Sequence, residues 1–155
     1  MLPDETNADS FTEFVTEKET PLRHALTAAF GAERGREACA EALAYGWEHW
    51  DRISEMENPA GYLYRVGRDR ARRMTQRPTV PLPPTAVGHE PWVEPGLPAA
   101  LERLSERQRL VVALLHGYQW SLAEVAEVLD VSKGTVQSYA ERGLKRLRRR
   151  LGVEL

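Results

Sequence analysis

The sequence predicts an all-α protein with two small helical domains joined by a proline-rich linker. Seven of the ten prolines lie between Pro78 and Pro98, and proline is excluded from helix interiors and interior strands. The flanking segments are rich in Ala, Leu, Glu and Arg, which favour helix, and they contain few β-branched runs. We therefore predict a first domain over 10–77, an extended linker over 78–98 and a second domain over 99–152.

Composition narrows the class of protein further. A chain of 155 residues with a single cysteine cannot form an intramolecular disulfide, so packing alone must hold its core in a reducing compartment. We expect the cytoplasm. The chain has no run of roughly 18 apolar residues, and its acidic start is unlike a secretion signal, so we expect no membrane partner.

The first domain shows four helical patterns. The apolar residues of 11–15 predict a short amphipathic helix, and Thr20 before Pro21 predicts the N-cap of a second helix that ends at Gly31. One apolar face predicts a third helix, with Cys39, Leu43, Gly46, Trp47 and Trp50. Asn58 is the predicted N-cap of a fourth helix, which presents Leu63, Val66 and Met74 inward and Arg65, Arg68 and Arg72 together on another face.

The second domain shows a helix-turn-helix pattern. It opens with a predicted helix that ends near Gly117 and has the inner residues Leu101, Leu104, Val111, Val112 and Leu115. Ser121 and Glu124 then form a predicted capping box at the start of a short helix, a tight turn follows at 130–131, and Ser132 caps the last helix. The outward residues of the last helix include Lys133, Gln137, Ser138, Glu141, Arg142 and Lys145.

Such a pair of helices suits DNA, because the first can brace the second while the second lies in the major groove. The last helix ends with six basic residues in the nine positions 142–150, which suits phosphate contacts. The alternatives are an ordinary αα-hairpin, and arginine faces that complement a helix dipole or are merely solvated. Two basic faces on either side of one linker favour an extended polyanion as the binding partner, because one such molecule could contact both faces.

The net charge of −2 conceals a strong segregation. Residues 1–57 carry five Lys and Arg against thirteen Asp and Glu, whereas 58–77 carry six Arg and one Asp. Residues 101–155 carry ten basic and seven acidic side chains. Because electrostatic fields in physiological salt extend over about one Debye length, ~8–10 Å, a binding partner responds to the charge of the nearby segment and not to the net charge of the chain. The acidic block suits a protein partner and the two basic helices suit nucleic acid.

Residues 101–148 resemble region 4 of bacterial sigma factors of the sigma-70 family, in particular those of the extracytoplasmic-function group. In that family, region 4 binds the promoter −35 element. The matching features are Leu101, Leu104, Arg109, Ser121-x-x-Glu124-Val125-Ala126, Val131-Ser132-x-Gly134-Thr135-Val136 and the closing basic helix. Residues 11–77 resemble region 2 through Glu37, Glu41, Trp47-x-x-Trp50, Asn58-Pro59-x-x-Tyr62-Leu63-Tyr64-Arg65-Val66 and an Arg-rich end. The family usually has proline at the position of Ser105 and glycine at that of Asp130, and Asp tolerates the left-handed conformation.

The resemblance implies a sigma factor that binds RNA polymerase core, through the β′ clamp and the β flap, and directs it to promoter DNA. The implied −35 contacts are Ser132, Lys133, Thr135, Gln137, Ser138, Arg142, Lys145 and Arg146. The implied −10 contacts are Tyr62, Tyr64, Arg65, Arg68 and Arg72, with packing as the alternative for either tyrosine. The implied polymerase contacts are Glu37, Glu41, Trp47 and Trp50, the two tryptophans being core or interface anchors. An anti-sigma factor is a further candidate partner.

Enzyme functions find little support in the sequence. The histidines stand in no metal-binding or triad spacing, there is no Gly-rich phosphate loop, and Cys39 lies on an apolar helix side. We expect no catalytic residue, metal or cofactor. The alternatives to a sigma factor are a stand-alone helix-turn-helix regulator that does not engage polymerase, and a protein–protein adaptor whose arginine faces are solvated.

Overall fold

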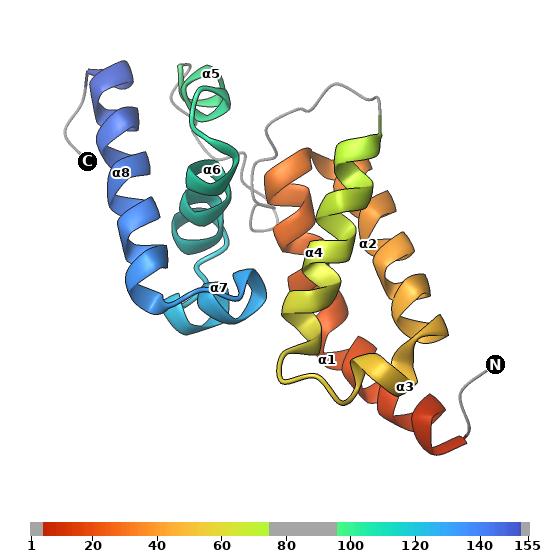
Figure 1. Cartoon of the computed structure of the whole chain (residues 1–155). Helices are drawn as coiled ribbons and strands as arrows, with labels where there is room; N and C mark the ends of the chain where they lie inside the picture. The colour runs from red at the N-terminus through yellow and green to blue at the C-terminus, as the bar shows by residue number, and fades with distance from the viewer. Residues whose placement is uncertain (1–4, 75–95, 153–155) are drawn as a thin grey trace, which may run out of the picture.

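The computed structural model describes residues 5–74 and 96–152, and every regular element within these ranges is a helix (Figure 1). The elements are α1 (Glu5–Phe30), α2 (Ala32–Glu48), α3 (Trp50–Ile53), α4 (Pro59–Arg73), α5 (Leu97–Glu102), α6 (Glu106–Val112), the π-helical turn η1 (Ala113–Gly117), α7 (Leu122–Leu129) and α8 (Lys133–Leu151). We call α1–α4 the N-terminal helix group and α5–α8 the C-terminal helix group. The predicted all-α class is confirmed for the described residues.

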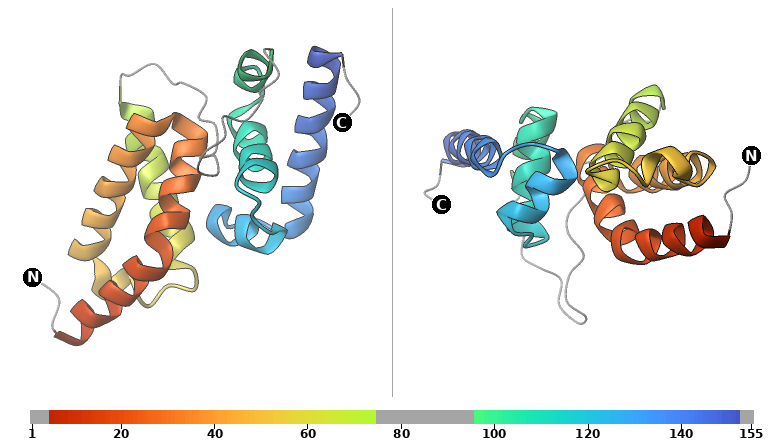
Figure 2. Two further views of the ribbon diagram at one scale, coloured as in Figure 1. Left: turned by 180° about the vertical axis from the view of Figure 1, so that it is seen from behind. Right: turned by 60° about the horizontal axis from the view of Figure 1, so that its bottom comes forward.

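Helix α1 is continuous where two helices were predicted. The predicted start at Thr20 and Pro21 is wrong, because α1 runs through Pro21 and begins at Glu5. Proline removes one backbone hydrogen bond, but Leu22 and Leu26 just after it are fully buried, and this packing offsets the loss. The right-hand view of Figure 2 shows α1 bending along its length, as expected for an internal proline.

Helix α2 folds back on α1 through two glycines. Gly31, between the helices, has φ 98°, which favours glycine. At Gly35 a Cβ would lie 2.5 Å from Thr27 backbone atoms, so only glycine allows this close approach. The third predicted helix is shorter than expected, because α2 ends at Glu48 and Trp50 begins the separate turn α3.

Two predicted boundaries in the second half need correction. The single helix expected from Leu101 is broken, because Ser105 caps the new helix α6: its Oγ accepts from the Gln108 N–H at 3.1 Å, and its own N–H donates to Gln108 Oε1 at 3.3 Å. Helix α5 begins at Leu97, so the end of the predicted linker at 98 is also wrong. The rest of that linker, 78–95, and the predicted domain end at 75–77 lie outside the described residues.

The two helix groups lie side by side and share one apolar core (Figures 1 and 2). This core joins residues of the first group, such as Leu22, Leu26 and Leu63, to Leu110, Leu114 and Val125 of the second. A smaller core inside the second group holds Leu101, Leu104 and Leu147. Within the described ranges, no helix is long and apolar enough to cross a membrane, and no three His, Cys, Asp or Glu side chains are grouped to hold a metal ion.

Candidate nucleic-acid interface

The helix-turn-helix predicted from the sequence is formed by α7 and α8. Ser121 Oγ accepts from the Glu124 N–H at 3.1 Å, and Glu124 Oε1 accepts from the Ser121 N–H at 3.0 Å, so the predicted capping box starts α7. These hydrogen bonds lower the pKa of the exposed Glu124 carboxyl. Asp130 ends α7 in the left-handed conformation, with φ 57° and ψ 49°, as expected for this position.

Helix α8 begins at the predicted cap. Ser132 Oγ accepts from the Thr135 N–H at 3.1 Å and lies 2.9 Å from Thr135 Oγ1. Val136 is fully buried against the core, which fixes the rotation of α8 about its axis. The start of α8 is therefore held by hydrogen bonds and packing before any ligand binds.

The outward face of α8 carries most of the predicted −35 contacts. Ser132, Lys133, Gln137, Arg142, Lys145 and Arg146 are exposed, and Thr135 and Ser138 are half-buried. Arg146 Nη1 donates to Gln108 Oε1 at 3.0 Å, which ties this arginine to α6. The remaining basic side chains of the closing turn, Arg148, Arg149 and Arg150, are exposed. Hydrogen-bonding side chains thus stand near the start of α8 and cations near its end.

The arginine face of α4 lies beside the C-terminal helix group. Arg65 Nη2 is 4.0 Å from Asp130 Oδ2, and Arg72 Nη2 donates to Glu106 Oε1 at 2.9 Å. Both arginines stay at least half exposed, and exposed ion pairs contribute only about 0–1 kcal/mol. Arg68 is different, because its side chain is only 18% exposed and its Nε lies 3.8 Å from Asp69 Oδ1.

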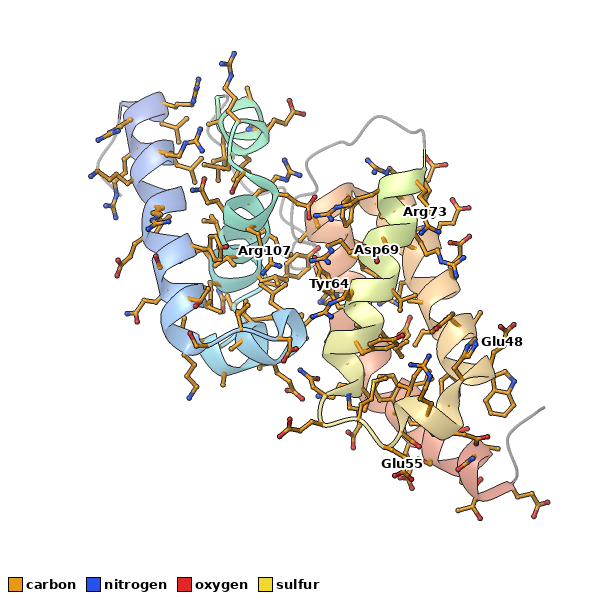
Figure 3. The ribbon with its side chains drawn as sticks, in the orientation of Figure 1. Glu48, Glu55, Tyr64, Asp69, Arg73 and Arg107 are labelled. Atoms are coloured by element: carbon orange, nitrogen blue, oxygen red, sulfur yellow. The ribbon has the colours of Figure 1, made fainter. Side chains whose placement is uncertain are left out.

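The two tyrosines of α4 have different environments. Tyr64 is 3% exposed within the shared core, and its burial raises the pKa of its hydroxyl. Figure 3 shows it on the side of α4 that faces Arg107 of α6. No base can stack on a ring in this position, so Tyr64 is a packing residue in this arrangement. Tyr62 is half-buried and lines a hollow of about 260 Å³ with Met56, Glu57, Asn58, Arg65 and Asp130.

Known proteins match both the sequence and the fold. A family model described as Sigma-70, region 4 matches residues 96–147. The chain is 32% identical over 151 residues to the RNA polymerase sigma-E factor of Streptomyces avermitilis, covering 91% of this chain and 84% of the relative. It is also 29% identical over 148 residues to the ECF RNA polymerase sigma factor SigL of Mycobacterium tuberculosis, covering 84% of each chain. The chain belongs to the extracytoplasmic-function group of the sigma-70 family.

A solved structure shares the fold of this sigma factor. The match is the sigma factor RpoE in complex with the anti-sigma factor NepR from Bartonella quintana, with a TM-score of 0.63 and 18% identity. The aligned region covers 94% of this chain and 99% of that chain. At this identity the likeness concerns the fold alone.

The predicted polymerase contacts of this sigma factor separate into two kinds. Glu37 and Glu41 are exposed on α2. Trp50 is only 3% exposed, its ring centroid lies 5.0 Å from that of Phe14, and its Nε1 donates to Ser10 Oγ at 3.2 Å. Trp47 is half-buried against Phe11. The core alternative therefore holds for Trp50, while Trp47 keeps an accessible part.

Two sets of contacts were missed by the sequence reasoning. One set makes polar contacts between the helix groups, including Lys18 to Glu127 at 3.3 Å and Arg109 Nη2 to the Ala29 carbonyl at 2.9 Å. No local pattern predicts such pairs. The other set, Tyr45, His49 and Arg52, stands next to Tyr62. The spacing of Tyr45, His49 and Arg52, i, i+4 and i+7, is the signal that could have found them.

Proposed function

We propose that this sigma factor binds RNA polymerase core and directs promoter-specific initiation, with α8 at the −35 element and α4 at the −10 element. The observation that carries the proposal is α8, whose start is capped and anchored while its outward face presents hydrogen-bonding side chains followed by cations. Bond formation belongs to the polymerase, so the sigma factor contributes binding and no catalytic residue. It acts in the cytoplasm, where the polymerase is.

The −35 contacts divide by chemistry. Lys133, Thr135, Gln137 and Ser138 stand in the first turns of α8, where a recognition helix reaches base edges, with the Ser132 cap beside them. Arg142, Lys145 and Arg146 follow along the helix and supply phosphate contacts, which carry the salt-dependent part of the affinity.

The −10 contacts are Tyr62, Arg65, Arg68 and Arg72 of α4. Arg65 and Arg72 now pair with Asp130 and Glu106 through exposed contacts that DNA phosphates can replace. Tyr64 is buried in the shared core, on the side of α4 that faces α6 (Figure 3), so it can join these contacts only once the C-terminal helix group has moved away. Promoter binding therefore requires the C-terminal helix group to move away from α4.

The acidic face of α2 is the proposed contact with the polymerase β′ clamp. Glu37 and Glu41 support it because both are exposed, and Trp47 adds a partly accessible ring, whereas Trp50 is confined to the core. The β flap is the proposed partner of the C-terminal helix group. An anti-sigma factor is a further proposed partner, supported by the complex known for the Bartonella quintana sigma factor.

Reconstitution tests the function directly. Polymerase core is combined with the full chain, and run-off transcription is measured on genomic fragments, together with capture of the core by the tagged chain. We expect transcripts that start at defined promoters sharing −35 and −10 elements. DNA binding without capture of core would instead establish a stand-alone regulator. Neither transcripts nor core binding would reject the proposal.

The two proposed classes of contact on α8 predict different variants. We expect Arg142→Ala to weaken binding of all −35 duplexes and to reduce the slope of log affinity against log salt by about 1. Gln137→Ala should instead change the base preference at one −35 position, by about 1–3 kcal/mol. Binding titrations at several salt concentrations measure both effects. Glu141→Ala, an exposed change on the same helix, is the control and should not weaken binding.

A further inference from the structure

Three ring side chains and one guanidinium form a cluster where α2, α3 and α4 meet. The rings of Tyr45 and His49 are stacked, with centroids 4.1 Å apart, and the Tyr62 ring lies 6.5 Å from that of Tyr45. Arg52 reaches both phenols: its Nη2 donates to Tyr45 Oη at 3.0 Å and lies 3.5 Å from Tyr62 Oη. We call these four residues the Arg52 cluster.

The Arg52 cluster is ordered but accessible. Arg52 is exposed, and the three rings are half-buried, so each is partly open to solvent. The Arg52 Cζ lies 5.6 Å from the centroid of the Tyr62 ring, within reach of a cation–π contact. Hydrogen bonds from Tyr45 and Arg52 lower the pKa of the Tyr62 hydroxyl. One guanidinium thus contacts both phenol hydroxyls and adds to the stacking of Tyr45 on His49.

The cluster continues into the arginine face of α4. Tyr62 belongs both to the cluster and to the hollow that Arg65 and Asp130 line. A nucleic-acid strand whose phosphates contact Arg65 would therefore bring its bases close to Tyr62, whose ring neighbours that of Tyr45. Ring faces beside cations are the combination that binds single-stranded nucleic acid, because every base can stack and every phosphate is attracted.

We propose that Arg52 is a positioning residue that holds Tyr45 and Tyr62 as a stacking platform for unpaired bases of the promoter −10 strand. The inference rests on the proposed function and deepens it, because it assigns residues of α2 and α3 to strand capture. If the cluster had only a structural role, substituting Arg52 would lower the stability of the fold and would not change the stacking of bound bases.

Fluorescence of a modified base tests the platform. Polymerase core reconstituted with the full chain is titrated with a single-stranded oligonucleotide of the non-template −10 strand, taken from a promoter found in the transcription assay and carrying 2-aminopurine. Stacking on a tyrosine quenches this base. We expect Arg52→Gln to reduce the quenching and to weaken binding of the single strand by roughly 5-fold or more, the low end of losing one stacked base. Binding of the −35 duplex should stay unchanged.

Conservative variants separate positioning from charge. Arg52→Lys keeps the cation but loses the planar guanidinium that lies over the Tyr62 ring, so it should retain more affinity than Arg52→Gln while losing quenching. Tyr45→Leu removes a ring and should lose quenching even with Arg52 present. Arg103→Gln, a charge change at another exposed arginine, is the control, and melting temperatures check that every variant is folded.

The outcomes distinguish this inference from the function beneath it. Promoter-dependent transcription by the wild type, with unchanged quenching in both Arg52 variants, overturns the inference alone. An equal loss in Arg103→Gln also overturns it, because the effect would then be general electrostatics. A wild-type chain that neither binds core nor directs transcription overturns the proposed function and the platform together.

Discussion

The backbones of α1 and α2 lie close together at Gly35, and this contact permits a direct test. A Cβ there would meet Thr27 N and Cα, backbone atoms that cannot rotate away. We expect Gly35→Ala to reduce the free energy of unfolding by about 1–3 kcal/mol in chemical denaturation, through overpacking.

Gly134→Ala is the matched control for Gly35. Its Cβ would meet nothing closer than Ser132 Oγ at 3.8 Å, so the substitution should be neutral or stabilise by up to about 1 kcal/mol. Equal stability of the two alanine variants would show that α1 and α2 can separate at little cost.

His24 gives the fold a dependence on pH. Its ring stacks on Tyr118 at 4.5 Å, across the two helix groups, and burial, followed by the Arg23 charge, lowers its pKa, which the Glu19 charge partly opposes. Because the folded pKa is below the unfolded value of about 6.5, the unfolded chain binds more protons at lower pH. We expect stability to fall as the pH drops below that value, and we expect His24→Gln to flatten this part of the curve of unfolding free energy against pH.

At the scale of one element, the cap of α7 can be tested with two substitutions at Ser121. Ser121→Ala removes the oxygen that accepts from the Glu124 N–H, and we expect it to destabilise the protein by about 1 kcal/mol. Ser121→Gly should lower the free energy of unfolding by only a few tenths of a kcal/mol, because glycine is itself an acceptable N-cap. Thermal unfolding followed by circular dichroism compares them, and the reverse order would contradict the capping role.

Three helix starts set by local chemistry were predicted correctly, whereas the continuity of α1, which depends on distant packing, was not. The caps at Asn58, Ser121 and Ser132 each depend on residues within a few positions, and all three are present. The continuity of α1 through Pro21 depends instead on the burial of the residues that follow against helices far along the chain. The break at Ser105 is a local signal that was overlooked, since Gln108 completes a capping box.

The same distinction applies to the candidate site. The outward face of α8 follows from helical periodicity, so its exposed residues could be predicted. Tyr64 lies two positions after Tyr62 and next to Arg65, and all three were predicted as −10 contacts. Its burial depends on the shared core, which no sequence pattern within α4 reveals. Trp50 is buried for a similar reason, because the aromatic residues that cover it come from α1.

At the scale of the molecule, one side chain links the start of α4 to the C-terminal helix group. Asn58 Oδ1 accepts from the Gly61 N–H at 2.9 Å as the N-cap, while its Nδ2 donates to the Glu127 carbonyl at 2.6 Å. Asn58→Asp keeps the acceptor but places a carboxylate against that carbonyl. We expect the helix groups to separate, which small-angle scattering would detect as an increased radius of gyration.

Asn58→Ser keeps the cap without adding charge, so it controls for electrostatics. Asn58→Ser should also increase the radius of gyration, because it loses the hydrogen bond to the Glu127 carbonyl. Helix content measured by circular dichroism should stay constant in both variants. Unchanged scattering profiles would show that apolar packing alone holds the groups together.

The shared core can be completed only after the C-terminal helix group has been synthesised. Arg109, which donates to the Ala29 carbonyl, follows it by 80 residues. At about 5–20 residues per second, translation leaves this side of α1 uncovered for roughly 4–16 s. During that interval the part of the shared core that α6 and η1 supply, including Leu110 and Leu114, is not yet present to cover the core residues of the N-terminal helix group. A chain stopped before α6 would therefore keep an apolar surface that the finished protein hides.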